Sequence, residues 1–259
     1  MREFGRRYDR RTFLARGAGA AAVFAVGGVG ASALSSCGTS NPNNPLARGK
    51  AGIGSGTPKR GGTVTIGMNS EIDGFLPSAS HFDNTGLTYA TTVFDSLTKI
   101  AADGSAKPYL AQSVTPNTDL TIWTVMLRPG VTFHDGSALD ADVVIANWQQ
   151  VKSSALTGQA VKPISTVTKT SDLEVQFIAD EPLVAFPAYL STQLGYVVAL
   201  SQLNASSPDN STKPIGTGPY KIVEWVPNDH FTVERNPAYW RKGLPYLDGI
   251  TFKPIIEDD

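Results

Sequence analysis

The sequence has very little of the residues that build covalent or metal frameworks. It contains one cysteine and three histidines among 259 residues. A disulfide framework, a cysteine-based zinc site and an iron–sulfur cluster are therefore excluded, and nothing in the sequence requires a cofactor or a resident metal. The 22 basic and 23 acidic residues nearly cancel, so the chain lacks the positive field that would hold nucleic acid.

The charge is unevenly distributed, and the imbalance lies at the N-terminus. Residues 1–36 contain six arginines against two acidic residues, whereas the rest carries 16 basic and 21 acidic residues. Arg10 and Arg11 precede an uncharged run of Ala, Gly and Val over residues 17–34. A positive region followed by an apolar one is typical of a secretory signal, and adjacent arginines are typical of twin-arginine export. We therefore predict a twin-arginine-type lipoprotein signal peptide over 1–36, with general export and an uncleaved signal anchor as alternatives.

The only cysteine lies at the predicted cleavage point. Leu34-Ser35-Ser36-Cys37 resembles a bacterial lipobox, which implies that Cys37 is lipidated and anchors the exported protein to the outer face of the cell membrane. Residues 37–61 are rich in Gly, Ser, Asn and Pro and are predicted to form a flexible tether. The basic residues of this tether are either solvated or in contact with anionic lipid head groups.

The remainder mixes strand and helix patterns without strict alternation, which predicts an α+β fold. Alternating residues predict strands over 63–68, 122–127, 196–200 and 250–255, and hairpins over 166–178 and 220–235. Helices are expected after Asp83 or Asn84 and after Ser137 as the first residue of a capping box, and a short helix is expected over 182–190. No segment after residue 61 is apolar for long enough to span a membrane.

No arrangement of nucleophile and base is recognisable. The Gly-x-Ser-x-Gly turn of serine hydrolases is absent. His81 and His134 each have an aspartate within two positions, but His134 is better interpreted as a turn residue that packs near the preceding strand. The Gly216–Tyr220 loop lacks the lysine and the following helix of a phosphate loop, so a structural turn is expected there. No catalytic residue is predicted.

Several motifs along the chain together resemble one family. The longest runs from Trp123 to Gly136 and contains Leu-Arg-Pro-Gly-Val-x-Phe-His-Asp-Gly. Five more motifs follow the order expected for that family: Gly61–Val64, Val93–Leu97 with Ala141–Val143, Gly216–Tyr220, Arg235–Trp240 and Pro245–Asp248. The sequence is similar to extracellular solute-binding proteins of family 5, the peptide- and nickel-type receptors of bacterial ABC importers.

The resemblance implies a mixed α/β lobe of the type II periplasmic-binding-protein kind. Residues 62–259 are expected to form lobe one, with an extra subdomain over roughly 80–190. The resemblance implies that a full-length member has two lobes, which close like a clamshell, and is about twice as long as this chain. The expectation is therefore that the second lobe is missing and that lobe one is incomplete at its C-terminus.

The resemblance also implies a function. The chain is expected to be a monomeric, lipid-anchored receptor that binds oligopeptides or dipeptides and delivers them to ABC permease subunits. A receptor for a nickel chelate or another small solute is one alternative; a docking or signalling lipoprotein and a surface hydrolase are others. The predicted ligand-binding residues are Asn69, Ser70, Glu71, Tyr89, Ser191, Thr192 and Gln193, with Glu71 suited to pair with a ligand amine.

Overall fold

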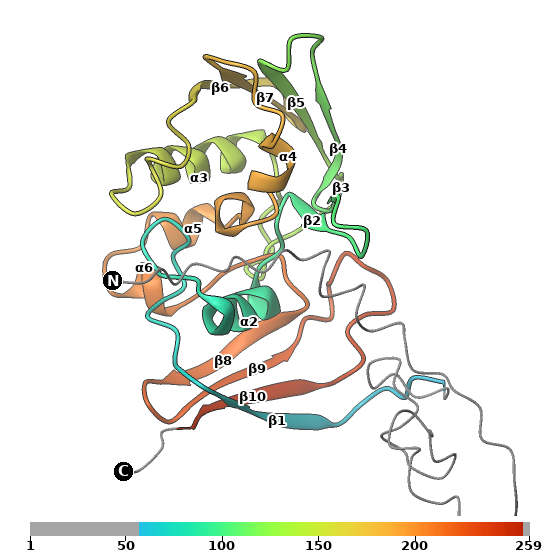
Figure 1. Cartoon of the computed structure of the whole chain (residues 1–259). Coiled ribbons are helices and arrows are strands. Elements are labelled where there is room, and N and C mark those ends of the chain that lie inside the picture. The colour runs from blue at the N-terminus through green and yellow to red at the C-terminus, as the bar shows by residue number, and fades with distance from the viewer. Residues whose placement is uncertain (1–56, 256–259) are drawn as a thin grey trace, which may run out of the picture. The chain divides into compact units, whose positions relative to one another are not determined.

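The computed structural model describes residues 57–255, and its first layer is a four-stranded sheet (Figure 1). In spatial order, the strands are β1 (Thr63–Met68), β10 (Gly249–Pro254), β9 (His230–Arg235) and β8 (Tyr220–Val226). β1 runs parallel to β10, and the other pairs are antiparallel. Helix α2 (Asn84–Val93) packs on one face of this sheet, where Tyr89 contacts Phe231 and Phe252. The predicted hairpin over 220–235 is confirmed, with its turn at residues 227–229.

The second layer is an antiparallel sheet covered by the longest helix of the described chain. Its strands, in spatial order, are β4 (Ala111–Pro116), β5 (Ile122–Leu127), β7 (Glu174–Ala179) and β6 (Ile164–Ser171). Helix α3 (Ala141–Ser153) buries Trp148 against Phe177 of β7, with ring centroids 4.9 Å apart. Strand β5 alternates buried and half-buried residues, as its sequence predicted.

Short elements connect the two sheets. They are the two-stranded β2 (Thr98–Ile100) and β3 (Ala106–Pro108), the helices α4 (Phe186–Tyr189), α5 (Leu200–Leu203) and α6 (Asp209–Thr212), and the 3-10 turn η1 (Gln193–Gly195). Two apolar cores result. One lies between the first sheet and α2, and the other draws on residues 97–199 around the second sheet. The α+β prediction is confirmed, and the boundaries 62–259 and 80–190 stay predictions.

Two helix predictions need correction. Asp140, and not Ser137, caps α3, because its carboxylate accepts from the backbone N–H of Val143 at 2.9 Å. Ser137 instead donates from its backbone N–H to Asp135. The short helix expected over 182–190 forms only as α4, Phe186–Tyr189; it starts later than predicted, because the N–H of Leu183 donates to Leu120 outside any helical ladder. The helix capped by Asp83 is confirmed.

The strand predicted over 196–200 is wrong. Tyr196 forms only an isolated bridge to Ser96, and Leu200 already begins α5. The backbone of Val198 is satisfied by a side chain: Asn147 Oδ1 accepts from its N–H at 3.0 Å, and Asn147 Nδ2 donates to its carbonyl at 2.8 Å. Because an amide side chain replaces the neighbouring strand, apolar alternation here does not lead to a sheet.

The predicted signal peptide over 1–36, the lipidated Cys37 and most of the 37–61 tether lie outside the described residues. Residues 57–61 of that tether are described and precede β1. Between residues 57 and 255, no helix is both long and apolar enough to cross a bilayer.

Candidate functional site

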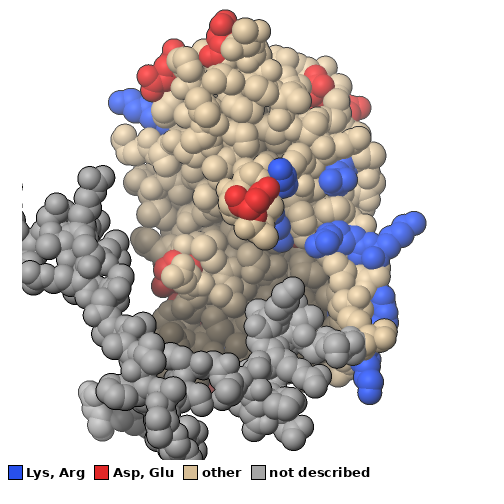
Figure 2. All heavy atoms as spheres, turned by 45° about the vertical axis from the view of Figure 1, so that its right-hand side comes forward, with Lys and Arg blue, Asp and Glu red and all other residues tan. Residues whose placement is uncertain are grey.

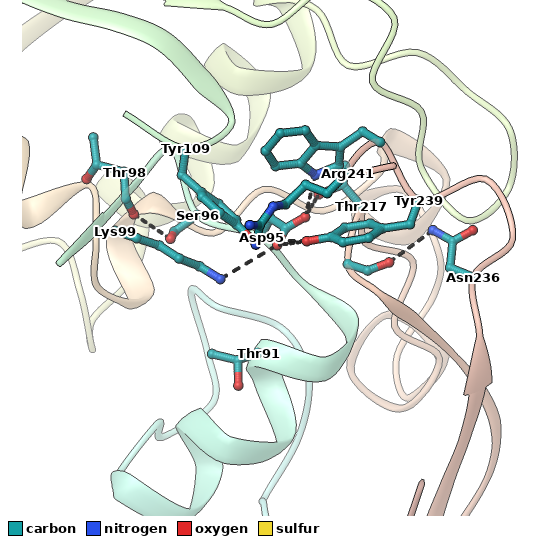
Figure 3. Close-up of polar contacts among 12 residues, drawn as sticks. Thr91, Asp95, Ser96, Thr98, Lys99, Tyr109, Thr217, Asn236, Tyr239 and Arg241 are labelled. Carbon is teal, nitrogen blue, oxygen red and sulfur yellow. Dashed lines mark hydrogen bonds and ion pairs between the residues drawn. The ribbon is translucent and has the colours of Figure 1, made fainter. Parts of the chain in front are cut away.

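Three of the motifs that carry the family resemblance meet at one buried carboxylate (Figure 3). Asp95 follows α2 and is fully buried. Its Oδ2 accepts from the indole N–H of Trp240 at 2.8 Å and from the hydroxyl of Thr217 at 3.4 Å. Its Oδ1 accepts from the hydroxyl of Tyr239 at 3.3 Å and lies 3.9 Å from Lys99 Nζ. We call this cluster the Asp95 junction.

Burial sets the chemistry of the Asp95 junction. Desolvation raises the pKa of Asp95, and the hydrogen bond from Trp240 opposes that rise together with the Lys99 charge. A second hydroxyl extends the network, since Tyr109 Oη lies 2.9 Å from Tyr239 Oη. The junction therefore ties the end of α2 to the segment after β9 and to the β2–β3 hairpin.

The Gly216–Tyr220 loop is the structural turn that the sequence predicted. A side chain at Gly216 would place its Cβ 1.9 Å from the carbonyl oxygen of Val93, and one at Gly218 would lie 2.5 Å from the Val93 carbonyl carbon. Glycine is required there because the loop lies directly against the end of α2. The Gly218 N–H donates to that same Val93 carbonyl.

His134 fastens the same loop and is uncharged. Its Nδ1 accepts from the Gly216 N–H at 3.3 Å, so its Nε2 carries the proton and donates to the Gly218 carbonyl at 3.1 Å. Burial lowers the pKa of His134 to about 4. The prediction of a packed turn residue is confirmed, and the hydrogen bonds of His134 stabilise the loop.

A different region forms a groove, where the predicted ligand-binding loop over 191–193 meets residues 77–80. Gln193 Nε2 donates to the carbonyl of Pro77 at 2.6 Å and to that of Ser80 at 2.9 Å. Ser154, just after α3, donates to the carbonyl of Ser78. The loop that follows β1 is therefore fixed from two sides, by the end of α3 and by η1. We call this region the Gln193 groove.

Two adjoining hollows make up the Gln193 groove, and Leu156 lines both. One has a volume of about 430 Å³ and the other about 510 Å³. The first is lined by Leu76, Ser78, Ala79, Gln150, Ser153, Ser154, Ala155 and Leu156. The second is lined by Phe82, Leu87, Ile100, Leu156, Thr157, Ala160, Ser191, Thr192, Gln193 and Leu194. Neither set contains a charged residue, so the groove offers apolar side chains with hydroxyl and amide groups among them.

The predicted residues Ser191, Thr192 and Gln193 all line this groove. Thr192 also caps η1 by accepting from the N–H of Leu194 at 3.3 Å. The hydroxyl of Ser191 donates to the carbonyl of Ala188. Their hydrogen bonds fix the loop in place, which is how small-ligand sites are usually preformed.

The other four predicted residues lie outside the two hollows. Asn69 and Ser70 are exposed after β1. Glu71 accepts from the indole N–H of Trp225 at 2.9 Å and from the backbone N–H of Asn228, so both of its carboxylate oxygens already have partners. Tyr89 is 1% exposed in the first core, where burial raises its pKa to about 12. Ligand binding by these four residues stays a prediction.

Sequence reasoning missed the contribution of the segment after α3. Leu156 keeps 42% of its surface exposed although it is apolar, and Ile100, which lines the second hollow with it, keeps 53%. The only signal available beforehand was an apolar residue in a Ser-Ser-Ala-Leu-Thr-Gly run after a helix. Across residues 57–255, no cluster of three histidine, cysteine or carboxylate side chains is arranged to hold a metal ion.

Comparison with known proteins identifies the class. The profile of bacterial extracellular solute-binding proteins, family 5 (middle region), matches residues 105–259, and the chain belongs to this family. Its members are solute-binding proteins and not enzymes, as the absence of a catalytic motif predicted.

Individual relatives agree with this assignment. The chain is 31% identical to the glutathione-binding protein GsiB of Pectobacterium atrosepticum over 180 residues, which is 68% of this chain and 35% of that protein. It superposes on the oligopeptide-binding protein AppA of Bacillus subtilis, solved with a nonapeptide, with a TM-score of 0.66 and 26% identity, over 77% of this chain and 41% of that one. It also superposes on NikZ of Campylobacter jejuni, solved with Ni(L-His), with a TM-score of 0.63 and 27% identity, over 74% of this chain and 39% of that one. The chain thus spans about two fifths of the length of these relatives.

Proposed function

We propose that the chain is the lobe-one part of an ABC-importer receptor and that the Gln193 groove is its solute-facing wall. The observation that carries the proposal is the groove itself, in which two loops far apart in sequence are fastened together around uncharged, mostly apolar hollows. Membership of a solute-binding family supports a binding role for that surface. The proposed solutes are dipeptides or oligopeptides, delivered to ABC permease subunits.

The chemistry of the groove favours peptides over bare metal ions. Its lining combines Leu156, Ile100 and Phe82 with the hydroxyls of Ser191 and Thr192. Apolar walls suit peptide side chains, and hydroxyl groups suit peptide N–H and carbonyl groups. The relatives are named or solved with glutathione, a nonapeptide and a nickel–histidine complex, all of which contain amino-acid groups. A nickel chelate is therefore the second candidate, since such a groove could contact its organic part.

The N-terminal region completes the proposal. Residues 1–36 would direct export by the twin-arginine route, and lipidation of Cys37 would anchor the protein to the outer face of the cell membrane. Residues 37–61 would serve as the tether and 62–259 as lobe one, with the subdomain over roughly 80–190. The receptor would act as a monomer. The adjacent Arg10 and Arg11 and the Leu-Ser-Ser-Cys sequence support the first two steps.

Saturation-transfer NMR on the purified chain tests the proposed groove. Signals are recorded for a set of di- and tripeptides, glutathione and the nickel–histidine complex, because this method detects weak contact. Leu156→Asp places a charge between the two hollows and is expected to weaken peptide contact at least tenfold. Val184→Asp is the matched control: Val184 is 71% exposed and lines neither hollow.

The outcomes separate the candidates. Peptide contact that Leu156→Asp removes and Val184→Asp retains supports the proposal. Contact with the nickel complex alone would replace peptides by the second candidate. Equal effects of the two substitutions, or no contact with any of these solutes, would refute the proposed groove.

A further inference from the structure

All four arginines of residues 57–255 gather around one segment, residues 236–248 between β9 and β10. Arg60 donates to the carbonyl of Gly243 at 2.7 Å, and Arg235 donates to that of Tyr246 at 2.7 Å. Arg241 belongs to the segment. The fourth, Arg128, lies over the ring of Trp240 at 5.3 Å. The four arginines of the described residues therefore contribute positive charge to one surface.

Lysines extend this surface, which we call the basic face. It comprises Lys59, Arg60, Lys99, Lys107, Arg128, Arg235, Arg241 and Lys242, eight of the 14 basic residues in the described range. Lys99 and Lys107 are direct partners across the β2–β3 pair. Figure 2 shows blue side chains gathered along one side of the molecule, whereas most red ones lie toward its upper edge.

Carboxylates neutralise little of this charge. Within the basic face, only two of the eight cations pair with exposed carboxylates: Lys107 with Asp103, and Arg235 with Asp248. The carboxylate near Lys99 is the buried Asp95.

Aromatic rings hold several cations instead. Lys99 Nζ lies 3.9 Å from the centre of the Tyr109 ring, with Arg241 on the same ring at 5.5 Å (Figure 3). Arg60 lies 5.7 Å from the Tyr246 ring. A ring face attracts a cation without cancelling its charge, so these groups are held in place and stay available to an external anion.

The preceding segment of the chain adds to the same charge. Residues 37–56 contain Arg48 and Lys50 and no acidic residue, so this segment is not an occupant that could neutralise the face. The chain then enters the described fold at Lys59 and Arg60, which belong to the basic face.

We propose that the basic face docks onto anionic phospholipid head groups of the membrane that carries the protein. Clustered lysine and arginine side chains are attracted to such a surface within about one Debye length, about 8 Å at physiological salt. The tether that leads to Cys37 ends at this face, so a lipid anchor and the face would meet the same membrane. The orientation of the protein on the membrane depends on the proposed lipid anchor at Cys37, whereas binding of the basic face to vesicles does not depend on it.

Vesicle co-sedimentation tests the inference with the full chain carrying Cys37→Ser, so that no acyl chain contributes. Vesicles of phosphatidylcholine with phosphatidylglycerol are compared with vesicles of phosphatidylcholine alone. The test variant is Arg241→Gln with Lys242→Gln. The control variant is Lys162→Gln with Lys253→Gln, which removes the same charge from exposed positions outside the face.

The expected result is preferential binding to the anionic vesicles that weakens with salt. The test variant is expected to lose about fivefold in partitioning per charge removed, and the control variant is expected to bind as the parent does. Equal losses in the two variants, or binding that ignores vesicle charge, would overturn the inference. Solute contact in the Gln193 groove is measured separately, so the two proposals fail independently.

Discussion

Replacement of Asp95 by alanine is predicted to destabilise the protein far more than replacement by asparagine. In Asp95→Ala the part-buried Trp240 Nε1 and the buried Thr217 Oγ1 lose their acceptor, at a cost of about 1–3 kcal/mol each. The hydroxyl of Tyr239 keeps its contact with Tyr109, so it adds little. The expected loss is therefore about 4 kcal/mol.

In Asp95→Asn the amide oxygen can still accept from Trp240. The variant also removes a carboxylate whose ionised form is disfavoured by burial. A loss of about 1 kcal/mol is expected, the net value of an ordinary hydrogen bond.

Urea unfolding followed by tryptophan fluorescence and circular dichroism measures both changes in the free energy of unfolding. The contrast between the two variants is the informative quantity, because both leave the surface unaltered. Equal losses, or a loss below about 1 kcal/mol in Asp95→Ala, would refute the claim that this carboxylate holds the motif segments together.

The remaining predictions concern His134 and the glycine loop. Since burial lowers the pKa of His134 to about 4 from 6.5, its contribution to stability is present above pH 6.5 and is lost as the pH falls through 4. Urea unfolding across this range is expected to show a smaller difference between parent and His134→Gln at the acidic end; parallel curves would contradict this. Gly216→Ala forces a Cβ against the Val93 carbonyl and is expected to cost about 2 kcal/mol or more. Gly104→Ala meets no atom within 4 Å. Its φ of 79° is left-handed, which costs a non-glycine residue about 1 kcal/mol. It is still expected to cost less than Gly216→Ala, and the reverse order in thermal unfolding would disprove the packing argument.

Local patterns predicted the regular elements well. The hairpin of β8 and β9 could be predicted because β-forming residues flank the turn Pro227-Asn228-Asp229 on both sides, although the pairing contains a register shift between Ile222 and Glu224. By contrast, β4 was missed, since Ala111–Pro116 is mostly polar or exposed and becomes a strand only through pairing with β5. The strand predicted over 196–200 does not form although its sequence alternates, because the side chain of Asn147, from another element, hydrogen-bonds the backbone of this segment. In both segments the contacts with distant parts of the chain decide whether a strand forms, and these contacts cannot be read from a single sequence.

The site was harder to predict than the fold. Three of the motifs that carried the family resemblance meet in the Asp95 junction, where they hold segments together and do not line the groove. The groove depends on contacts such as that from Gln193 to Pro77, which are 116 residues apart in sequence. The prediction of Gln193 as a site residue came from the family resemblance, whereas Leu156 carried no motif.

Hydrogen–deuterium exchange of the chain with and without a bound peptide tests the central claim most directly. We expect slower exchange in three segments at once, residues 76–80, 150–157 and 191–194, with β8 and β9 unchanged. Protection confined to other segments, or identical exchange with and without a peptide that contacts the protein in the NMR experiment, would contradict the assignment of the Gln193 groove as the solute-facing wall.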